Sequence, residues 1–377
     1  TDCHKRDLCG VSEPLYPQHP RSGLTKGHTM AYGYDAYADC AERWSAKPRP
    51  PRVAYAGDPA AGAVMSTPRY LVADVGATHT RLALADPTGL QGQVCRLATA
   101  DISDGATLVA AAERQLNVRG LSGGCIALAG PVEGQRGVLT NGALNLDGAE
   151  LSRRLGCPVK LINDFGALAR SLPMLRSLQQ IGGRGSPEAS AVKVVVGPGS
   201  GLGMGILIPE PHGWRALASE GGHGDLAPGS HLEMELLALL QAEHGHVSWE
   251  TVLSGPGLVR LYRGVCALWG VRADTVTPEW ISANGLDATE PVCHQTLETF
   301  CALLGAAAGN LAVTVAATGG VYIGGGIVTR MLDFVRESPM RRRFEERGAM
   351  TDFVQQIPIM VILEPEPGLM GAARCLQ

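Results

Sequence analysis

The sequence predicts an α/β protein with more than one domain. From Tyr70 onward, short apolar runs rich in Val, Ile and Leu alternate with longer stretches of helical composition. Glycine-rich turns follow several of these runs. The chain has 377 residues, of which 45% are hydrophobic, so it can bury a sizeable core, and its length exceeds that of a typical single domain of roughly 150 residues.

Strands are expected where an apolar, β-branched run stops at a turn. The expected strands are 70–75, 81–85, 124–131, 158–162, 192–196, 202–208, 321–323 and 357–363. The expected helices are 106–116, 166–172, 231–243, 249–269, 291–317 and a terminal helix that opens at Pro367. The order strand, glycine turn, strand occurs twice, at 70–85 and at 192–208. This weak internal repeat predicts two similar halves that face each other.

Composition excludes several classes of function. Only five of the 32 basic residues are lysine, and none follows a glycine, so neither a Walker A loop nor a kinase-like V-A-I-K strand is present. A net charge of −4 argues against nucleic acid as a partner. We expect no membrane span and no secretory signal. Ten cysteines without a C-x-x-C pair suit a reducing, cytoplasmic location.

Residues 1–64 differ from the rest of the chain. They are rich in proline and show no sustained apolar periodicity, so they cannot bury enough surface to offset the entropy of ordering. We expect a disordered or non-native extension, with the folded protein beginning near Met65. A regulatory or docking arm is the alternative.

Three glycine clusters suggest a nucleotide site. Asp74-Val75-Gly76-Ala77-Thr78 joins the strands of the first hairpin, and Gly197-Pro198-Gly199-Ser200-Gly201 joins those of the second. Small residues in such turns let phosphate oxygens approach backbone N–H groups, and a carboxylate at a strand end suits magnesium. A third cluster, Gly319-Gly320 and Gly324-Gly325-Gly326, brackets a strand. Each cluster alone reads as ordinary turns, but together they favour nucleotide binding.

Polar residues at two further places suit a sugar hydroxyl. Asp164 ends a parallel-type strand, where ligands of α/β sheets bind, and can accept a proton from a substrate. A helix N-cap is the equal alternative for Asp164. Glu220 and His223 lie among glycines in a loop that suits a polyol, whereas zinc ligation would need a helix there. Glu250 follows Ser248 at a helix start, where an acid is favourable in any case.

Taken together, these segments resemble the bacterial-type ATP-dependent glucokinases, the branch of the hexokinase-like family without the zinc signature. The resemblance runs in family order from about Arg69 to the C-terminus. The matching segments are LVADVGATHTRLAL, IALAGPV, LTN, LINDFGALA, GPGSGLGMG, SEGGHGDLAP, HVSWETVLSGPGL, GGVYIGGGIV and EPGLMGA. Each segment alone is weak evidence, whereas the ordered set is specific.

The resemblance implies a two-domain actin-like, ribonuclease-H-like ATPase fold with a cleft between the domains. Residues 65–174 with 364–377 would form a small domain, and 175–363 a large one. It implies phosphorylation of glucose to glucose 6-phosphate, the first step of glycolysis, with glucose, ATP and Mg²⁺ as ligands, in a homodimer.

The resemblance also assigns roles to residues. Asp164 would be the catalytic base. The glucose ligands would be Asn141, Asn163, Asp164, Glu220, His223 and Glu250. The ATP ligands would be Asp74, Gly76, Ala77, Thr78, His79, Arg81, Gly199, Ser200, Gly201, Gly319, Gly320, Gly324 and Gly325. Asp74 would hold Mg²⁺ through water.

The first phosphate turn departs from the family pattern D-x-G-G-T-N at two positions. Ala77 replaces the second glycine, which is tolerable only at negative φ, because a Cβ penalises positive φ by ~1 kcal/mol or more. His79 replaces the asparagine and remains able to donate to phosphate. The alternatives are therefore a non-catalytic sugar-sensing regulator, or a kinase for another hexose or with another phosphoryl donor.

Overall fold

The computed structural model describes residues 67–140 and 142–377. Residues Met65–Gln377 form one compact unit. The predicted extension at 1–64 and the predicted sugar ligand Asn141 lie outside the described residues.

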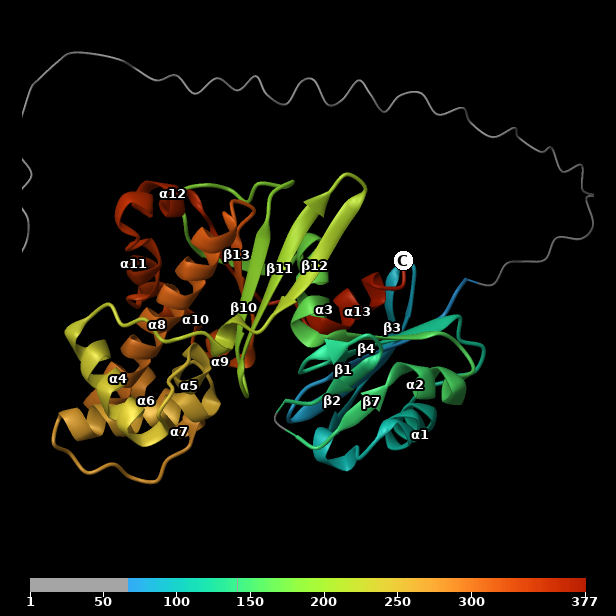
Figure 1. Cartoon of the computed structure of the whole chain (residues 1–377), viewed down its shortest axis with the longest axis horizontal. Helices are drawn as coiled ribbons and strands as arrows, with labels where there is room; N and C mark the ends of the chain where they lie inside the picture. Colours follow the sequence, from blue (N-terminus) through green and yellow to red (C-terminus); the bar gives the residue numbers. More distant parts are fainter. Residues whose placement is uncertain (1–66, 141) are drawn as a thin grey trace, which may run out of the picture. The chain divides into compact units, whose positions relative to one another are not determined.

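The first sheet has five strands in the order β3-β2-β1-β4-β8 (Figure 1). Its strands are β1 (Tyr70–Val75), β2 (His79–Asp86), β3 (Gly89–Ala98), β4 (Gly123–Leu128) and β8 (Val159–Asn163). β1 pairs antiparallel with β2 and parallel with β4, and β4 pairs parallel with β8. The predicted hairpin and parallel strands are therefore confirmed. β3 was not predicted, because as a partly exposed strand with two glycines it lacks a continuous apolar run.

The second sheet has six strands in the order β12-β11-β10-β13-β14-β9. Its strands are β9 (Leu178–Gly182), β10 (Lys193–Pro198), β11 (Leu202–Glu210), β12 (Gly213–Ser219), β13 (Val321–Ile323) and β14 (Ile359–Ile362). β10 pairs antiparallel with β11 and parallel with β13, as β1 does with β2 and β4. The two hairpins thus occupy equivalent places in the two sheets. A small third sheet contains β5 (Val132–Glu133), β6 (Arg136–Val138) and β7 (Asn145–Asp147).

Successive side chains of a strand point to opposite faces of the sheet, and in the first sheet both faces are buried. Leu71 and Ala73 of β1 pack into one cluster with α1 (Gly105–Gln115) and α2 (Gly148–Leu155). Val72, between them, faces the other way and packs against α13 (Pro367–Arg374). The last helix therefore covers one face of a sheet formed by the early part of the chain. Figure 1 shows it beside this sheet.

The helix α3 (Asp164–Ser171) contacts both sheets. It leaves β8 of the first sheet and packs on α13, while Leu168 and Leu172 share a cluster with Val195 and Leu207 of the second sheet. In Figure 1, α3 and α13 lie between β12 and β4. The assignment of residues to a small and a large domain stays a prediction, which the placement of one sheet within 70–163 and the other within 178–362 supports.

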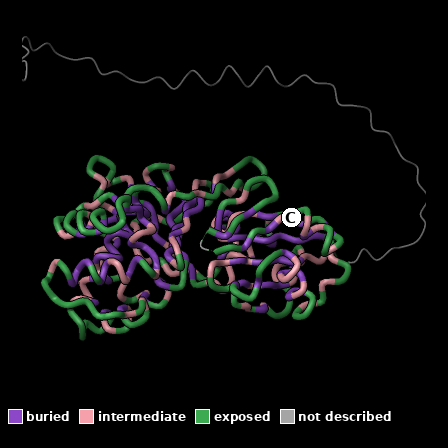
Figure 2. Tube along the Cα trace, turned by 60° about the horizontal axis from the view of Figure 1, so that its bottom comes forward, coloured by how far each residue is buried: buried purple, intermediate pink, exposed green. Residues whose placement is uncertain are grey.

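Helices cover the face of the second sheet opposite α3, and with it they form the largest hydrophobic core. Figure 2 shows the buried segments of the chain in purple. They are α4 (His231–His244), α5 (Trp249–Val252), α6 (Gly255–Leu268), α7 (Pro278–Leu286), α8 (Pro291–Val315), α9 (Gly326–Arg330), α10 (Leu332–Glu337), α11 (Met340–Glu345) and α12 (Thr351–Gln356). The prediction of a single helix over 249–269 is wrong, because this segment forms two helices. Ser254 accepts from Gly257 N at 3.0 Å and caps a new helix with Pro256 in its first turn.

The central helix α8 is apolar around most of its surface. By length and composition alone it could cross a membrane, but 67% of its most apolar window is buried inside the protein. A Cβ on Gly305 would overlap the carbonyl of Met340, so the small residue lets α8 and α11 approach closely. The pattern is that of a core helix.

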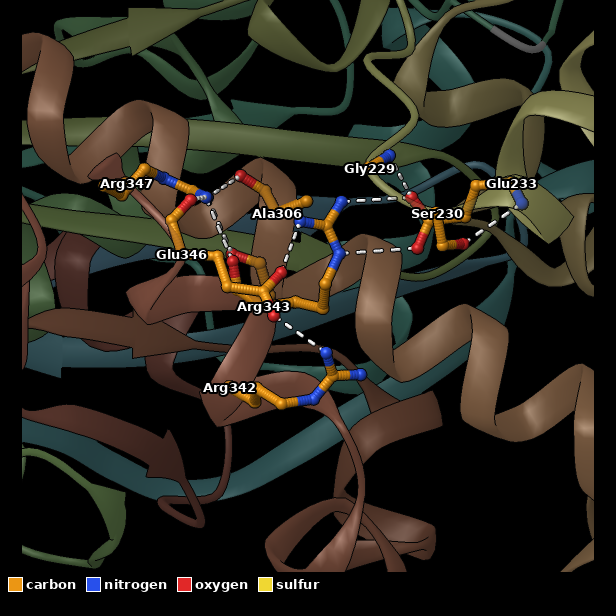
Figure 3. A network of polar contacts seen from close by, with 9 residues as sticks. Gly229, Ser230, Glu233, Ala306, Arg342, Arg343, Glu346 and Arg347 are labelled. Atoms are coloured by element: carbon orange, nitrogen blue, oxygen red, sulfur yellow. Dashed lines mark hydrogen bonds and ion pairs between the residues drawn. The ribbon is translucent and has the colours of Figure 1, made fainter.

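A buried ion pair joins α11 to α4 (Figure 3). Arg343 Nη2 lies 3.0 Å from Glu233 Oε2, and the two side chains are 8% and 4% exposed. Gly229 N donates to the same carboxylate at 2.6 Å. The neighbouring Arg342 also reaches a carboxylate, that of Glu346, but both of these side chains are largely exposed.

We expect Arg343→Ala to destabilise the protein by about 3–5 kcal/mol, because it leaves the Glu233 charge buried without a partner. The matched control Arg342→Ala should cost less than about 1 kcal/mol, since its ion pair is in solvent. Urea unfolding followed by fluorescence measures both. Equal urea midpoints for the two variants would contradict the larger loss of stability that we expect for the buried ion pair.

Candidate active site

A cavity of about 490 Å³ opens between the two sheets. It is lined by residues that follow β1, β8, β10 and β13 at their carboxyl ends, together with the first residues of α13. Carboxyl ends of parallel strands are where α/β sheets bind ligands.

The first predicted phosphate turn lies in this cavity. Gly76 N donates to His79 O at 3.0 Å, and the hydroxyl of Thr99 donates to Gly76 O at 2.7 Å. The second contact comes from outside the turn and was not predicted. Ala77 is not among the residues with positive φ, so the condition for tolerating alanine at this position is met. The turn is therefore intact despite its departures from the family pattern.

The second predicted turn faces the first. Gly255 N donates to Gly199 O at 2.8 Å, which ties the turn to the start of α6. The hydroxyls of Thr78 and Ser200 lie 3.1 Å apart, so the two turns meet directly. A chain of phosphates running between them would have backbone N–H groups on both sides.

The third glycine cluster divides between the two ends of β13. Gly324 and Gly325 follow the strand and line the cavity. Gly325 has φ +90°, and a Cβ there would overlap the carbonyl of Pro198, so only glycine fits. Gly319 and Gly320 precede the strand and do not line the cavity, so their contact with a nucleotide stays a prediction that the cavity does not support. A strand separates its two ends, and only the carboxyl end faces the site.

Asn163 and Asp164 stand where β8 passes into α3. The helix cap is Asn163, whose Oδ1 accepts from Gly166 N at 2.9 Å, while its Nδ2 donates to Gly130 O at 3.1 Å. Asp164 is the first residue of the helix and accepts from Phe165 N at 2.9 Å. The N-cap alternative therefore applies to Asn163 and leaves the Asp164 carboxylate facing the cavity.

Burial raises the pKa of Asp164 to about 7, and the nearby charges of Asp74 and Glu220 add to the shift. Burial likewise raises the pKa of Asp74, which Arg81 opposes and Glu366 reinforces. A carboxyl that titrates near neutral pH is suited to accept a proton during a reaction.

The ring of Phe165 fills a slot in the second hairpin. Gly197 and Gly203 are paired across β10 and β11. A Cβ on Gly197 would stand 2.7 Å from Phe165 Cζ, and one on Gly203 would overlap the ring. The residue next to Asp164 is thus fixed against the hairpin that carries the second phosphate turn.

Three other residues predicted to bind the sugar also line the cavity. Glu220 Oε2 and His223 Nε2 lie 4.0 Å apart, and both side chains are about half exposed. The short 3₁₀ turn Gly221–His223 sets their spacing. Glu250 Oε2 accepts from Leu202 N at 2.8 Å, which fixes it beside the second turn. No group of three or more potential metal ligands occurs among the described residues.

Sequence reasoning missed a carboxylate at the cavity edge. Arg81 Nη1 lies 3.1 Å from Asp74 Oδ2, and its Nε lies 3.0 Å from Glu366 Oε2. Arg96 also pairs with Glu366. Arg81, predicted to bind ATP, therefore lines the cavity with its charge already engaged by two carboxylates. Glu366 begins the EPGLMGA segment and takes a left-handed φ of 54°, at a cost of roughly 1 kcal/mol.

Comparisons with known proteins agree with this geometry. A family profile described as Glucokinase matches residues 71–377. A glucokinase of Chromobacterium violaceum is 41% identical over 306 residues, covering 80% of this chain and 88% of the relative. One from Cronobacter sakazakii is 41% identical over 312 residues, covering 81% and 96%. The chain belongs to the glucokinase family.

Solved structures agree in fold. The crystal structure of a glucokinase from an Antarctic psychrotroph superposes with a TM-score of 0.70 at 34% identity, covering 82% of this chain and 98% of that one. A ROK family glucokinase of Streptomyces griseus, solved with glucose and AMPPNP, superposes with a TM-score of 0.56 at 20% identity, covering 81% of this chain and 98% of that one. At this identity the similarity supports the fold alone. The chain has the two-domain actin-like ATPase fold.

Most of the residues assigned from the glucokinase family come together in the one cavity. Those that line it are Asp74, Gly76, Ala77, Thr78, His79, Arg81, Asn163, Asp164, Gly199, Ser200, Gly201, Glu220, His223, Glu250, Gly324 and Gly325. Their individual roles stay predictions.

Within the glucokinase fold, substitution of the glycines that make room for the Phe165 ring tests how much this contact stabilises the protein. We expect Gly203→Ala to cost about 1–3 kcal/mol, because the new Cβ overlaps the ring. The control Gly199→Ala should change stability by less than about 0.5 kcal/mol, since a Cβ there meets no atom within 4 Å. Urea unfolding compares them. Adding Phe165→Leu to Gly203→Ala should recover part of the loss; a purely additive pair would show that the ring is not the cause.

Proposed function

We propose that this chain transfers the γ-phosphoryl group of ATP to the 6-hydroxyl of glucose, with Asp164 as the general base. One observation carries the proposal: the partly buried carboxyl of Asp164 lines the same cavity as two glycine turns, whose hydroxyls on Thr78 and Ser200 lie 3.1 Å apart. The cavity thus combines a proton acceptor with a phosphate clamp. Membership of the glucokinase family supports the same activity.

The phosphates of ATP would lie between the two turns. No lysine lines the cavity among the described residues. Stabilisation of the transferred group therefore falls to the two hydroxyls and to other backbone N–H groups of the two turns, because those of Gly76 and Gly199 already donate to His79 O and Gly201 O. Groups fixed in such turns are preorganised and need no reorientation during the reaction. Gly324 and Gly325 would leave room for the adenosine.

The residues present fit Mg²⁺ bound mainly by ATP. Asp74 supplies a carboxylate, the hard oxygen ligand that Mg²⁺ prefers, and its Oδ2 is held by Arg81. Asp74 would hold the ion, directly or through water. When bound, Mg²⁺ would neutralise charge on the phosphates.

Asp164 would orient the 6-hydroxyl and take its proton. Phosphoryl transfer passes through a loose transition state, so the proton leaves late and positioning supplies most of the rate. The hydrogen bond from Phe165 N and the ring in its glycine slot hold the carboxylate in place. Closure of the cavity would exclude water as a competing acceptor.

The sugar would lie among Asn163, Glu220, His223 and Glu250, which all line the cavity. Carboxylates and an imidazole accept and donate hydrogen bonds to several hydroxyls of a hexose. Asn141 belongs to the same proposal through the family resemblance alone.

Further properties belong to the proposal. The seven cysteines within the described residues are all free thiols, which supports a reducing, cytoplasmic location. A homodimer, and the absence of nucleic-acid and membrane partners, rest on the family resemblance and the balanced charge. A screen of several hexoses and phosphoryl donors with product detection separates glucose and ATP from other acceptors and donors, and from a sugar-sensing regulator without turnover.

We expect Asp164→Asn to lower kcat by roughly 10²–10⁴-fold, because the amide cannot accept the proton. Glucose affinity should change little, since the amide keeps the size of the carboxyl. A coupled assay measures turnover, and titration calorimetry measures binding. Near-normal turnover with unchanged affinity would show that Asp164 is not the base.

Activity should also depend on pH through Asp164. Its pKa is raised to about 7, so the carboxyl becomes protonated, and unable to act as base, as pH falls through neutrality. We expect kcat/KM for glucose at saturating ATP to fall about tenfold per unit on the acid side and to level off above about pH 8. A profile flat between pH 6 and 8 would exclude this titration. The residual activity of Asp164→Asn should lack the inflection.

A further inference from the structure

Two cysteines meet at the end of α13 remote from the cavity. Cys125 lies on β4, fully buried in the cluster that Val72 and Leu369 share on the α13 face of the first sheet. Cys375 follows α13, is partly exposed and packs against the same cluster. Neither residue takes part in the phosphoryl-transfer site.

Neighbouring contacts fix Cys375 over this part of the sheet. Lys160 is paired with Cys125 across β4 and β8, so the two side chains share a face. Lys160 Nζ donates to the carbonyl of Cys375 at 2.9 Å. A Cβ on Gly123, two residues before Cys125 on the same face, would stand 3.9 Å from Leu376 Cδ2. Cys375 and Leu376 therefore pack on the face of the first sheet that carries Cys125.

The surroundings make the two thiols unequal. The interaction of the Cys375 sulfur with the thiol of Cys125, together with the positive charges of Arg170 and Lys160, lowers the pKa of Cys375 to about 6, against the effect of burial. The same interaction and burial raise the pKa of Cys125. By contrast, burial raises the pKa of Cys301 to about 12. One partly exposed thiolate thus faces one buried thiol.

We propose that Cys375 and Cys125 form a peroxide-reactive thiol pair, in which Cys375 attacks the oxidant and Cys125 resolves the product to a disulfide. A partly exposed thiolate is the form of cysteine that reacts with peroxides. A second thiol in contact with it converts the first product before further oxidation occurs.

The chemistry balances with hydrogen peroxide as oxidant. The Cys375 thiolate attacks one peroxide oxygen, so that an S–O bond forms, the O–O bond breaks, and hydroxide leaves and takes up a proton to become water. Cys125 then attacks the Cys375 sulfur; the S–S bond forms, the S–O bond breaks, and hydroxide leaves as water with the proton of Cys125. Two thiols lose two electrons, and one peroxide becomes two waters.

The disulfide would fasten the end of α13 to β4. A cross-link between segments far apart in the chain restricts the unfolded state and so raises the melting temperature. Oxidation should therefore raise the melting temperature, and dithiothreitol should reverse the change.

The test treats the full chain with a small excess of hydrogen peroxide, then blocks free thiols, digests without reductant and identifies peptides by mass spectrometry. Peptide resolution separates Cys3, Cys9 and Cys40 from the pair. We expect a linked peptide containing Cys125 and Cys375, lost after dithiothreitol, and a rise in the melting temperature of several degrees. Absence of the linked peptide would overturn the proposal, as would Cys375 oxidised beyond sulfenic acid while Cys125 stays free.

Three variants separate the roles of the thiols. Cys375→Ser should abolish both the linked peptide and fast alkylation by iodoacetamide at pH 7. Cys125→Ala should leave Cys375 reactive but without a cross-link, so that its sulfenic acid is trapped by dimedone. The control Cys301→Ser removes a buried thiol elsewhere and should leave the linked peptide unchanged. Loss of the linked peptide in the control, or its persistence in Cys375→Ser, would exclude the pair.

Discussion

The structure depends on the contact between the ring of Phe165 and the paired glycines Gly197 and Gly203. Phe165 belongs to α3, which leaves the first sheet, whereas the glycines belong to the hairpin of the second. The ring occupies the space that side chains at both positions would fill. This one contact sets the distance between Asp164 and the second phosphate turn, because Asp164 is the adjacent residue. Closely packed interiors transmit small shifts, so the positioning of the base depends on how well this slot is filled.

Electrostatics give the cavity a second constraint. Asp74 and Asp164 are both partly buried, and the charge of Asp74 adds to the rise in the pKa of Asp164. Arg81 offsets this repulsion by pairing with Asp74 and Glu366, which also fastens the start of α13 to the first hairpin. The same arginine therefore holds a cavity wall in place and limits the negative potential that incoming phosphates meet.

The sequence predicted the elements with strong local signals and missed those that depend on distant contacts. Apolar runs and glycine turns identified the two hairpins, β8 and α8. The partly exposed β3 has no continuous apolar run, and the break at Ser254 lies within an otherwise helical composition. For the site, the resemblance located most of the cavity residues. Gly319 and Gly320 lie outside the cavity lining, and a glycine count does not distinguish the two ends of a strand.

Glu366 and Phe165 show why the remaining parts of the site escaped prediction. Glu366 is an acid between two prolines, and only its pairing with Arg81 and Arg96, on strands far away in the sequence, makes it part of the cavity edge. Phe165 reads as an ordinary helix residue until the glycine pair opposite it is seen. Both roles come from tertiary neighbours, about which a local pattern carries no information.

The position of α13 has a consequence for how the protein is made. The strands β1, β2 and β4 emerge early from the ribosome, but among the described residues the helix that covers the face carrying Val72, Ala83 and Cys125 is α13, which lies beyond the whole second sheet in the chain. Until that helix is synthesised, this apolar face stays open to water and to other chains. The half that is translated first is thus completed last, so nascent chains that stall before Pro367 should be the species that chaperones bind and that aggregate.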